Sequence, residues 1–151
     1  MIKDLFYWSQ VWDNEWINSF VGLINGEVIP SSYSYDKINY DIVVGSGNPY
    51  INISGKDNEH SILIPEKNIL FFKSLKELYP DKKHKPNCIV HLTVNNYSFK
   101  LADTIKSIEY DLNNYDTDFI YATDIYGDSI TINKKYILYI TQEEEKEEED
   151  K

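Results

Sequence analysis

Near the N-terminus, large apolar residues recur every three or four positions. They are Leu5, Trp8, Trp12, Trp16 and Phe20. This spacing predicts an amphipathic helix over residues 4–20. The Trp side chains can cover a sheet face in the core, or some of them can stay exposed as anchors for a partner, where Trp is enriched. We predict that Trp8 and Trp16 belong to the exposed group.

After this helix the pattern changes to short apolar runs separated by turn residues, which predicts strands joined by tight turns. The predicted hairpins pair residues 21–24 with 27–29, 50–54 with 62–64, 89–94 with 97–101, and 119–124 with 129–132. Asn25-Gly26 and Asn95-Asn96 provide the residue types that hairpin turns need. Further strands are expected over residues 68–72 and 136–141.

Helices are predicted between some of these hairpins. The first begins at Ser31 or Ser32 and runs to about residue 42, and the second begins at a capping Asp103 and runs to about residue 113. The first has poor helix propensity of its own and is predicted mainly from its correspondence with the second. A third, over residues 73–80, ends at Pro80. The expected order in each half is therefore β-β-α-β-β with one further strand.

The two halves also match in sequence. Residues 61–72 read SILIPEKNILFF and residues 129–140 read SITINKKYILYI, with Ser, Ile, Ile, Lys, Ile and Leu in common. The match extends upstream, where Tyr40-Asp41 corresponds to Tyr110-Asp111. A duplicated unit of this kind is too small to bury its apolar face alone, so two copies are expected to share a core.

These patterns predict an α+β fold made of a tandem, pseudo-twofold β-β-α-β-β repeat with an extra N-terminal amphipathic helix. Residues 1–142 are expected to form one globular body. Within that body, repeat 1 spans about 20–72, a linker spans 73–87, and repeat 2 spans about 88–141. Residues 143–151 form a block of like charges, which predicts a disordered acidic tail.

The charge of the chain limits its partners. The net charge is −10, the 15 basic residues are all Lys, and Arg is absent. An acidic chain without Arg is a poor nucleic-acid binder, because phosphate and base-edge recognition rely on positive charge and on Arg in particular. We expect no nucleic acid and no membrane as partners. A protein with a basic surface is the expected partner, and homodimerisation is a further option.

The chain contains one cysteine, Cys88, in an apolar strand pattern, so a buried and inert thiol is expected. The N-terminus lacks the pattern of a signal peptide. The expected location is the cytoplasm of a bacterium, or the host cytoplasm if a phage encodes the chain, as the bias towards Asn, Ile, Tyr and Lys suggests.

No catalytic constellation is visible. His60 lies between Glu59 and Ser61 in the sequence, but a catalytic triad is recognised by geometry, and none can be placed around His60, His84 or His91. Gly45-Ser46-Gly47 is followed by a strand and not by the Lys and helix of a phosphate loop. Four acids gather at Asp116, Asp118, Asp124 and Asp128, but their spacing is not that of a calcium loop. The sequence therefore predicts no enzyme, no metal and no cofactor.

The 13 tyrosines exceed what a core needs. Tyr places rigid amphipathic area on a surface at a low entropic cost, which suits recognition. We therefore predict a partner-binding surface that combines Trp8, Trp16, Tyr115 and Tyr126 with Asp116, Asp118, Asp124 and Asp128.

Three kinds of function fit these observations. The leading hypothesis is a non-enzymatic acidic inhibitor that neutralises a protein partner, as a toxin-immunity protein or as an anti-defence inhibitor from a phage. The second is a small-molecule or nucleotide binder with a pocket between the repeats, where Lys134-Lys135 or Lys82-Lys83 could supply positive charge. The third is an assembly component of a phage or secretion system.

Overall fold

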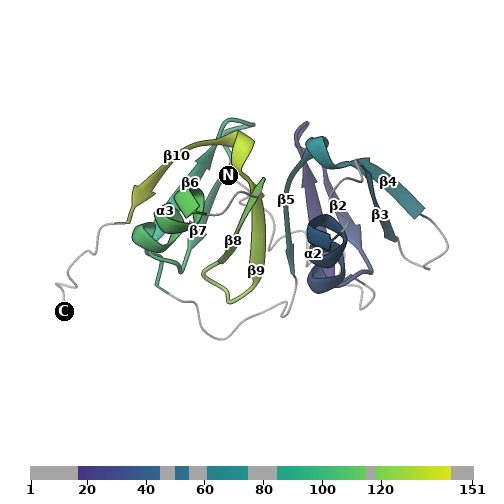
Figure 1. The fold of residues 1–151 in the computed structure, drawn as a ribbon, viewed down its shortest axis with the longest axis horizontal. Helices are drawn as coiled ribbons and strands as arrows, with labels where there is room; N and C mark the ends of the chain where they lie inside the picture. Colours follow the sequence, from purple (N-terminus) through teal and green to yellow (C-terminus); the bar gives the residue numbers. More distant parts are fainter. Residues whose placement is uncertain (1–16, 45–49, 55–60, 75–84, 115–117, 144–151) are drawn as a thin grey trace.

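A computed structural model describes residues 17–44, 50–54, 61–74, 85–114 and 118–143, and for residues 43 and 44 it describes the backbone alone. These residues form ten strands and two α-helices, and all the strand pairs are antiparallel. The fold is therefore α+β, as predicted (Figure 1). The predicted helix over 4–20 lies outside the described residues up to position 16, and it is wrong at its end, because Ser19 and Phe20 begin a strand. The acidic tail after Glu143 also lies outside the described residues.

The elements follow one another as two series. The first series is β1 (Ser19–Leu23), β2 (Val28–Ser31), α2 (Tyr35–Val44), β3 (Tyr50–Ser54), β4 (Ser61–Pro65), a 3₁₀ turn (Glu66–Asn68) and β5 (Ile69–Ser74). The second series is β6 (Cys88–Leu92), β7 (Ser98–Leu101), α3 (Ile105–Asn114), β8 (Phe119–Thr123), β9 (Ser129–Asn133), a 3₁₀ turn (Lys134–Tyr136) and β10 (Ile137–Gln142).

The turn residues do what their chemistry predicts. Gly26 has a φ of 98°, and Asn95 and Asn96 have φ values of 52° and 57°. These positive angles are accessible to Gly and Asn with little strain. All four predicted hairpins are present, as β1–β2, β3–β4, β6–β7 and β8–β9.

Both helices begin later than predicted. The side chain of Ser34 accepts a hydrogen bond from Lys37 N at 3.1 Å, and that of Thr104 accepts one from Ser107 N at 3.1 Å. These are the capping contacts. Asp103, the predicted cap, instead accepts from Thr123 N at 2.7 Å and so fastens the start of the helix to β8.

The strands form three sheets (Figure 1). A five-stranded sheet has the order β2-β1-β5-β9-β8, a three-stranded sheet has the order β10-β6-β7, and β3 and β4 form a hairpin of their own. The predicted helix over 73–80 is wrong at its first two residues, because Lys73 and Ser74 continue β5. These two residues also belong to the predicted linker, whose other described residues, 85–87, have no helix or strand.

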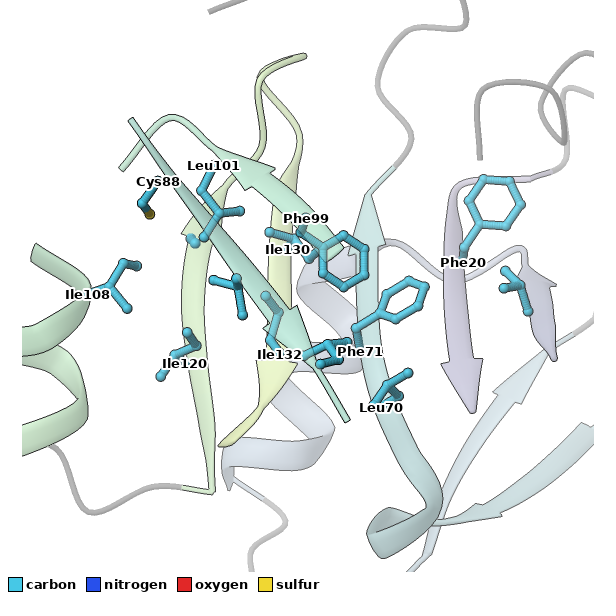
Figure 2. Packing of buried hydrophobic residues seen from close by; sticks show 14 of the residues in the cluster. Phe20, Leu70, Phe71, Cys88, Phe99, Leu101, Ile108, Ile120, Ile130 and Ile132 are labelled. Atoms are coloured by element: carbon cyan, nitrogen blue, oxygen red, sulfur yellow. The ribbon is translucent and has the colours of Figure 1, made fainter. Parts of the chain in front are cut away.

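Two apolar clusters pack on either side of the five-stranded sheet. One gathers Val21, Ile69 and Phe72 under α2 and the β3–β4 hairpin. The other joins Phe20 and Phe71 to side chains of the second series, including Phe99, whose ring centroid lies 4.9 Å from that of Phe71 (Figure 2). All six residues of β5 are therefore buried.

The pairing of the halves differs from the expected one. β9 stays paired with β8 of its own half and also pairs with β5 of the other half. β10 pairs with β6 and, among the described residues, has no pairing with β4. A twofold arrangement would repeat the β5–β9 contact between β10 and β4. The two halves therefore meet through unlike surfaces, the edge of β5 in the first and the edge of β9 in the second.

Neither α-helix of the described part is long and apolar enough to cross a membrane.

Candidate functional site

The exposed large apolar side chains of the described residues are concentrated on three strands. They are Tyr50 on β3, Leu63 on β4, and Leu138 and Tyr139 on β10, together with Tyr40 on α2 and Tyr110 on α3. Leu63 and Leu138 are the most exposed of these four apolar strand residues, at 65% and 59%. Isolated exposed apolar residues are ordinary on a protein surface, but groups of them on strand edges mark contact sites.

Strand β10 has one edge in use. It pairs with β6, so that Tyr139 lies opposite His91 and Ile140 lies opposite Val90. Its other edge pairs with no strand in the described part of the chain. That edge offers a row of backbone N–H and C=O groups, which an added strand can pair with.

The side chains around this edge form what we call the β10 surface, namely Leu138, Tyr139 and Thr141. The Tyr139 ring lies on the His91 ring, with centroids 4.4 Å apart and an angle of 33° between the planes. His91 Nε2 lies 3.2 Å from Thr141 Oγ1, and this hydrogen bond holds the imidazole in place. The result is an exposed aromatic side chain, 53% accessible, that is oriented by its neighbours.

A groove of about 360 Å³ runs between α3 and β10, beside the β10 surface. Ile105 and Leu112 of α3 line one side, and Ile137 and Ile140 of β10 line the other, with Tyr139 also lining it. An apolar groove beside an open strand edge gives an added strand both main-chain partners and places for its side chains.

Strand β4 has a second open edge. It pairs with β3, where Leu63 lies opposite Asn52 and Ile64 lies opposite Ile51. On its other side it pairs with no strand among the described residues. Figure 1 places β4 and β10 at opposite ends of the long axis of the molecule.

The residues predicted to bind a partner are not brought together by what the structure describes. Trp8, Trp16, Tyr115 and Asp116 lie outside the described residues. Asp118 is exposed, and its backbone oxygen accepts a hydrogen bond from Lys134 N at 2.9 Å. Tyr126 is half-buried in the β8–β9 turn, where its N–H donates to Asp124 Oδ1 at 2.9 Å.

Asp124 and Asp128 are buried, which does not suit the partner-binding role predicted for them. Lys73 Nζ lies 2.7 Å from Asp124 Oδ2 and 3.3 Å from Asp128 Oδ2, and Ser74 Oγ donates to Asp128 Oδ1 at 3.1 Å. We call these four residues the Lys73 cluster. It ties the end of β5 to the β8–β9 turn, so its function in the described structure is to join the two series.

The residues of the β10 surface and Leu63 were not predicted as site residues. The sequence did mark β10 as an apolar strand, because Leu138 and Tyr139 align with Leu70 and Phe71 in the match between the halves. The apolar pattern gave no means to tell a covered strand from an uncovered one.

A cleft of about 490 Å³ lies at the two 3₁₀ turns, where the halves meet. Lys67, Lys134 and Lys135 line it together with Glu66 and Asp118. Partial burial raises the pKa of the Glu66 carboxyl, and the nearby charge of Asp118 adds to this effect. The two acids of the cleft offset much of the positive charge of its three lysines.

Within the described ranges, no three His, Cys, Asp or Glu side chains converge to hold a metal ion. The Cys88 thiol is fully buried and donates to Asp103 O at 3.3 Å, which confirms the prediction of a buried thiol. No protein-family model, curated protein or solved structure matches the chain.

Proposed function

We propose that this chain is a non-enzymatic protein-binding protein that holds its partner against the β10 surface. The observation that carries the proposal is the exposure of Leu138 and Tyr139 on a strand whose outer edge has no partner strand in the described part. Apolar side chains beside open main-chain groups are the features that strand-adding partners use. Natural proteins usually protect such an edge from chance pairing, so an apolar one indicates a contact.

The proposal includes an internal duplication of the chain. The two series run through the same elements in the same order, so that Cys88 follows Ser19 by 69 positions and Ile137 follows Ile69 by 68. In both series the helix contacts the third strand and the last strand, as α2 with β3 and β5 and as α3 with β8 and β10.

Hydrogen bonds outside the regular elements support the duplication further. Matched bonds are Asn18 Nδ2–Ser32 O at 2.7 Å with Asn87 Nδ2–Ala102 O at 2.6 Å, and Ile24 N–Asn68 O at 3.0 Å with Thr93 N–Tyr136 O at 2.9 Å. Such bonds depend on the detailed path of the connections, so their recurrence at corresponding positions favours two copies of one unit.

The duplication makes β10 the counterpart of β5, and the two strands differ in burial. Leu70 and Phe71 are fully buried, whereas Leu138 and Tyr139 are exposed. The apolar character of the strand is thus present in both copies, although the described structure covers it in one copy only. A partner that covers β10 would bury the second set as well.

The charge of the chain indicates the kind of protein partner. Residues 143–151 directly follow β10 and carry seven acids and two lysines. A partner with a basic surface next to an apolar patch would satisfy both features, since complementary charge speeds and orients association. An inhibitor that neutralises a toxin, or a host-defence protein, by covering a basic site is a function of this kind.

The two other candidate functions rest on other observations. An assembly component is favoured by the presence of open strand edges at both ends of the molecule. A small-molecule binder would use the cleft at the two 3₁₀ turns, where three lysines gather. Glu66 and Asp118 offset much of that positive charge, so the cleft is the weaker candidate for an anionic ligand.

Affinity capture tests the proposal. Full-length chain is immobilised and exposed to extract of the cells that encode it, as wild type, as Tyr139→Glu, and as Tyr40→Glu. Tyr40 is a matched control because it is a Tyr of comparable exposure, 61% against 53%, that lies on a helix, α2. We expect a partner that wild type and Tyr40→Glu retain, and whose affinity falls at least about tenfold with Tyr139→Glu, as for a central interface residue.

Circular dichroism and thermal melting of each variant show that the fold is intact. Retention of every bound protein by a folded Tyr139→Glu variant would contradict the assignment of the site to β10.

A further inference from the structure

We propose that the partner of the β10 surface is a second copy of this chain, which adds its β4 edge to β10. This inference rests on the part of the proposed function that assigns partner binding to the β10 surface. It places a second copy of this acidic chain there, in place of the partner with a basic surface considered above. The contact repeats, between two molecules, the junction that already joins β5 to β9 inside one molecule.

The internal junction supplies the template for this contact. β5 pairs with β9 so that Phe71 lies opposite Ile132 and Phe72 lies opposite Thr131. Residues 61–74 and 129–142 correspond at a constant separation of 68 positions, from β4 and β9 through the 3₁₀ turns to β5 and β10. The template therefore fixes a register for the new pair.

In that register, Tyr139 of one copy lies opposite Ile64 of the second copy, and Ile140 lies opposite Leu63. Both strands are open on the required edge within the described residues. Pairing them would continue the sheet from one molecule into the next, in the antiparallel sense seen at β5 and β9.

The exposed residues of β10 coincide with positions that the internal junction buries. Leu138 and Tyr139 correspond to Leu70 and Phe71, which are both 0% exposed. The opposite side of the contact behaves in the same way, because Leu63 corresponds to Thr131, which is also 0% exposed. An exposed residue on each strand thus has a buried counterpart in the junction.

Tyr50 and the helix tyrosines extend this comparison. Tyr50 is exposed, and its counterpart Phe119 is buried against Phe72, with ring centroids 6.3 Å apart. Tyr40 and Tyr110 correspond to each other and are exposed in both halves. The junction buries neither, so the comparison predicts that the contact leaves both accessible.

The groove between α3 and β10 fits the same occupant. Its counterpart is the space between α2 and β5, where Tyr35 OH of α2 lies 2.5 Å from Thr131 Oγ1 of β9. In the second contact, Leu63 and Tyr50 of the second copy would lie at the groove of about 360 Å³. The groove is lined mainly by apolar residues, which suits the Leu and Tyr side chains.

The contact joins unlike surfaces. β4 and β10 lie at opposite ends of the molecule (Figure 1), so each added copy leaves one open β4 and one open β10. Association is therefore head-to-tail, and it either closes into a ring or continues as a chain. The counterpart of Lys73 is Thr141, so the contact lacks the Lys73 cluster and is expected to be reversible.

Two blocked variants test this arrangement by sedimentation velocity. Leu63→Lys places a charge on the β4 edge, and Tyr139→Lys places one on the β10 surface. Wild type is expected to form species heavier than the 17.8 kDa monomer, in amounts that rise with concentration. Each variant alone is expected to stay monomeric.

A mixture of the two variants is expected to form a one-to-one pair and nothing larger, because only one intact contact is available. Tyr40→Lys is the control and should behave as wild type.

Several outcomes would overturn the inference. A wild type that stays monomeric, or a mixture with no pair, would show that β4 does not bind β10. Backbone amides of β4 that are protected from hydrogen exchange in a monomer would show that another part of the same chain covers this edge. If the wild type is monomeric and yet captures a different protein through Tyr139, the inference fails and the proposed function stands. If Tyr139 affects neither self-association nor capture, both fail.

Discussion

At the scale of single residues, the Lys73 cluster gives the sharpest stability prediction. Lys73 is 4% exposed and forms ion pairs with two buried carboxylates, Asp124 and Asp128. Lys73→Met would remove the ammonium group that pairs with both buried acids. We expect the free energy of unfolding, measured by urea denaturation at pH 7, to fall by about 3–5 kcal/mol, as for other buried ion pairs that lose one partner.

Lys37→Met is the matched control for this prediction. Lys37 Nζ lies 2.9 Å from Asp41 Oδ2, but this pair is on the surface of α2 and half of the Lys37 side chain is accessible. An exposed pair of this kind contributes roughly 0.3–0.5 kcal/mol. Equal losses in the two variants would mean that the Lys73 cluster is not buried as described.

Cys88 gives one prediction for the reactivity of its thiol and one for the dependence of stability on pH. Burial raises the pKa of its thiol from 9.0 to about 11, and the charge of Asp103 adds to the shift. Because the thiolate is the reactive form, iodoacetamide should modify the folded chain slowly near pH 8 and the urea-unfolded chain quickly. Rapid modification of the folded chain would contradict this account.

The same shift makes stability depend on pH with a definite sign. Between pH 9.0 and about 11 the unfolded thiol loses its proton while the folded thiol keeps it. The folded state then binds more protons than the unfolded state, so this group makes the chain less stable as pH rises through that range.

At the scale of elements, the local patterns were sufficient for the hairpins and for α3, whereas α2 was predicted mainly from its correspondence with α3. Asn25-Gly26 and Asn95-Asn96 form turns because few other residues accept the positive φ angles found there. The helix caps were displaced because tertiary contacts competed for the same residues. Asp103 bonds to Thr123 N, which left Thr104 to cap α3.

The pattern could not decide how strands are covered. β5 and β10 have similar sequences, but β5 is buried on both faces and β10 is not. Burial there depends on whether β9 arrives at the strand edge, which is a long-range event and not a property of the strand. For the same reason Asp124 and Asp128 were predicted as partner-binding acids, although Lys73, more than fifty residues earlier, holds them inside.

At the scale of the whole molecule, the sequence match between the halves indicated a duplication but not how the copies meet. A shared core was expected from a twofold arrangement, whereas the β5–β9 pairing joins unlike surfaces. This difference changes the expected behaviour of the molecule. A twofold arrangement buries its contact surfaces in one step, while a head-to-tail arrangement leaves one of each at the ends.

Disulfide trapping tests the head-to-tail contact most directly, because it reads the register residue by residue. Leu63→Cys and Ile140→Cys are made in separate chains, mixed and oxidised, with the buried Cys88 left in place. Facing residues of antiparallel strands bring their Cβ atoms within about 4.5–5.5 Å, close to what a disulfide needs. Leu138→Cys replaces Ile140→Cys in the control, which shifts the cysteine two positions along β10. We predict a covalent dimer that contains one chain of each kind in the first mixture and little in the control. Equal yields in both mixtures, or no mixed dimer in either, would contradict the proposed pairing of β10 with β4.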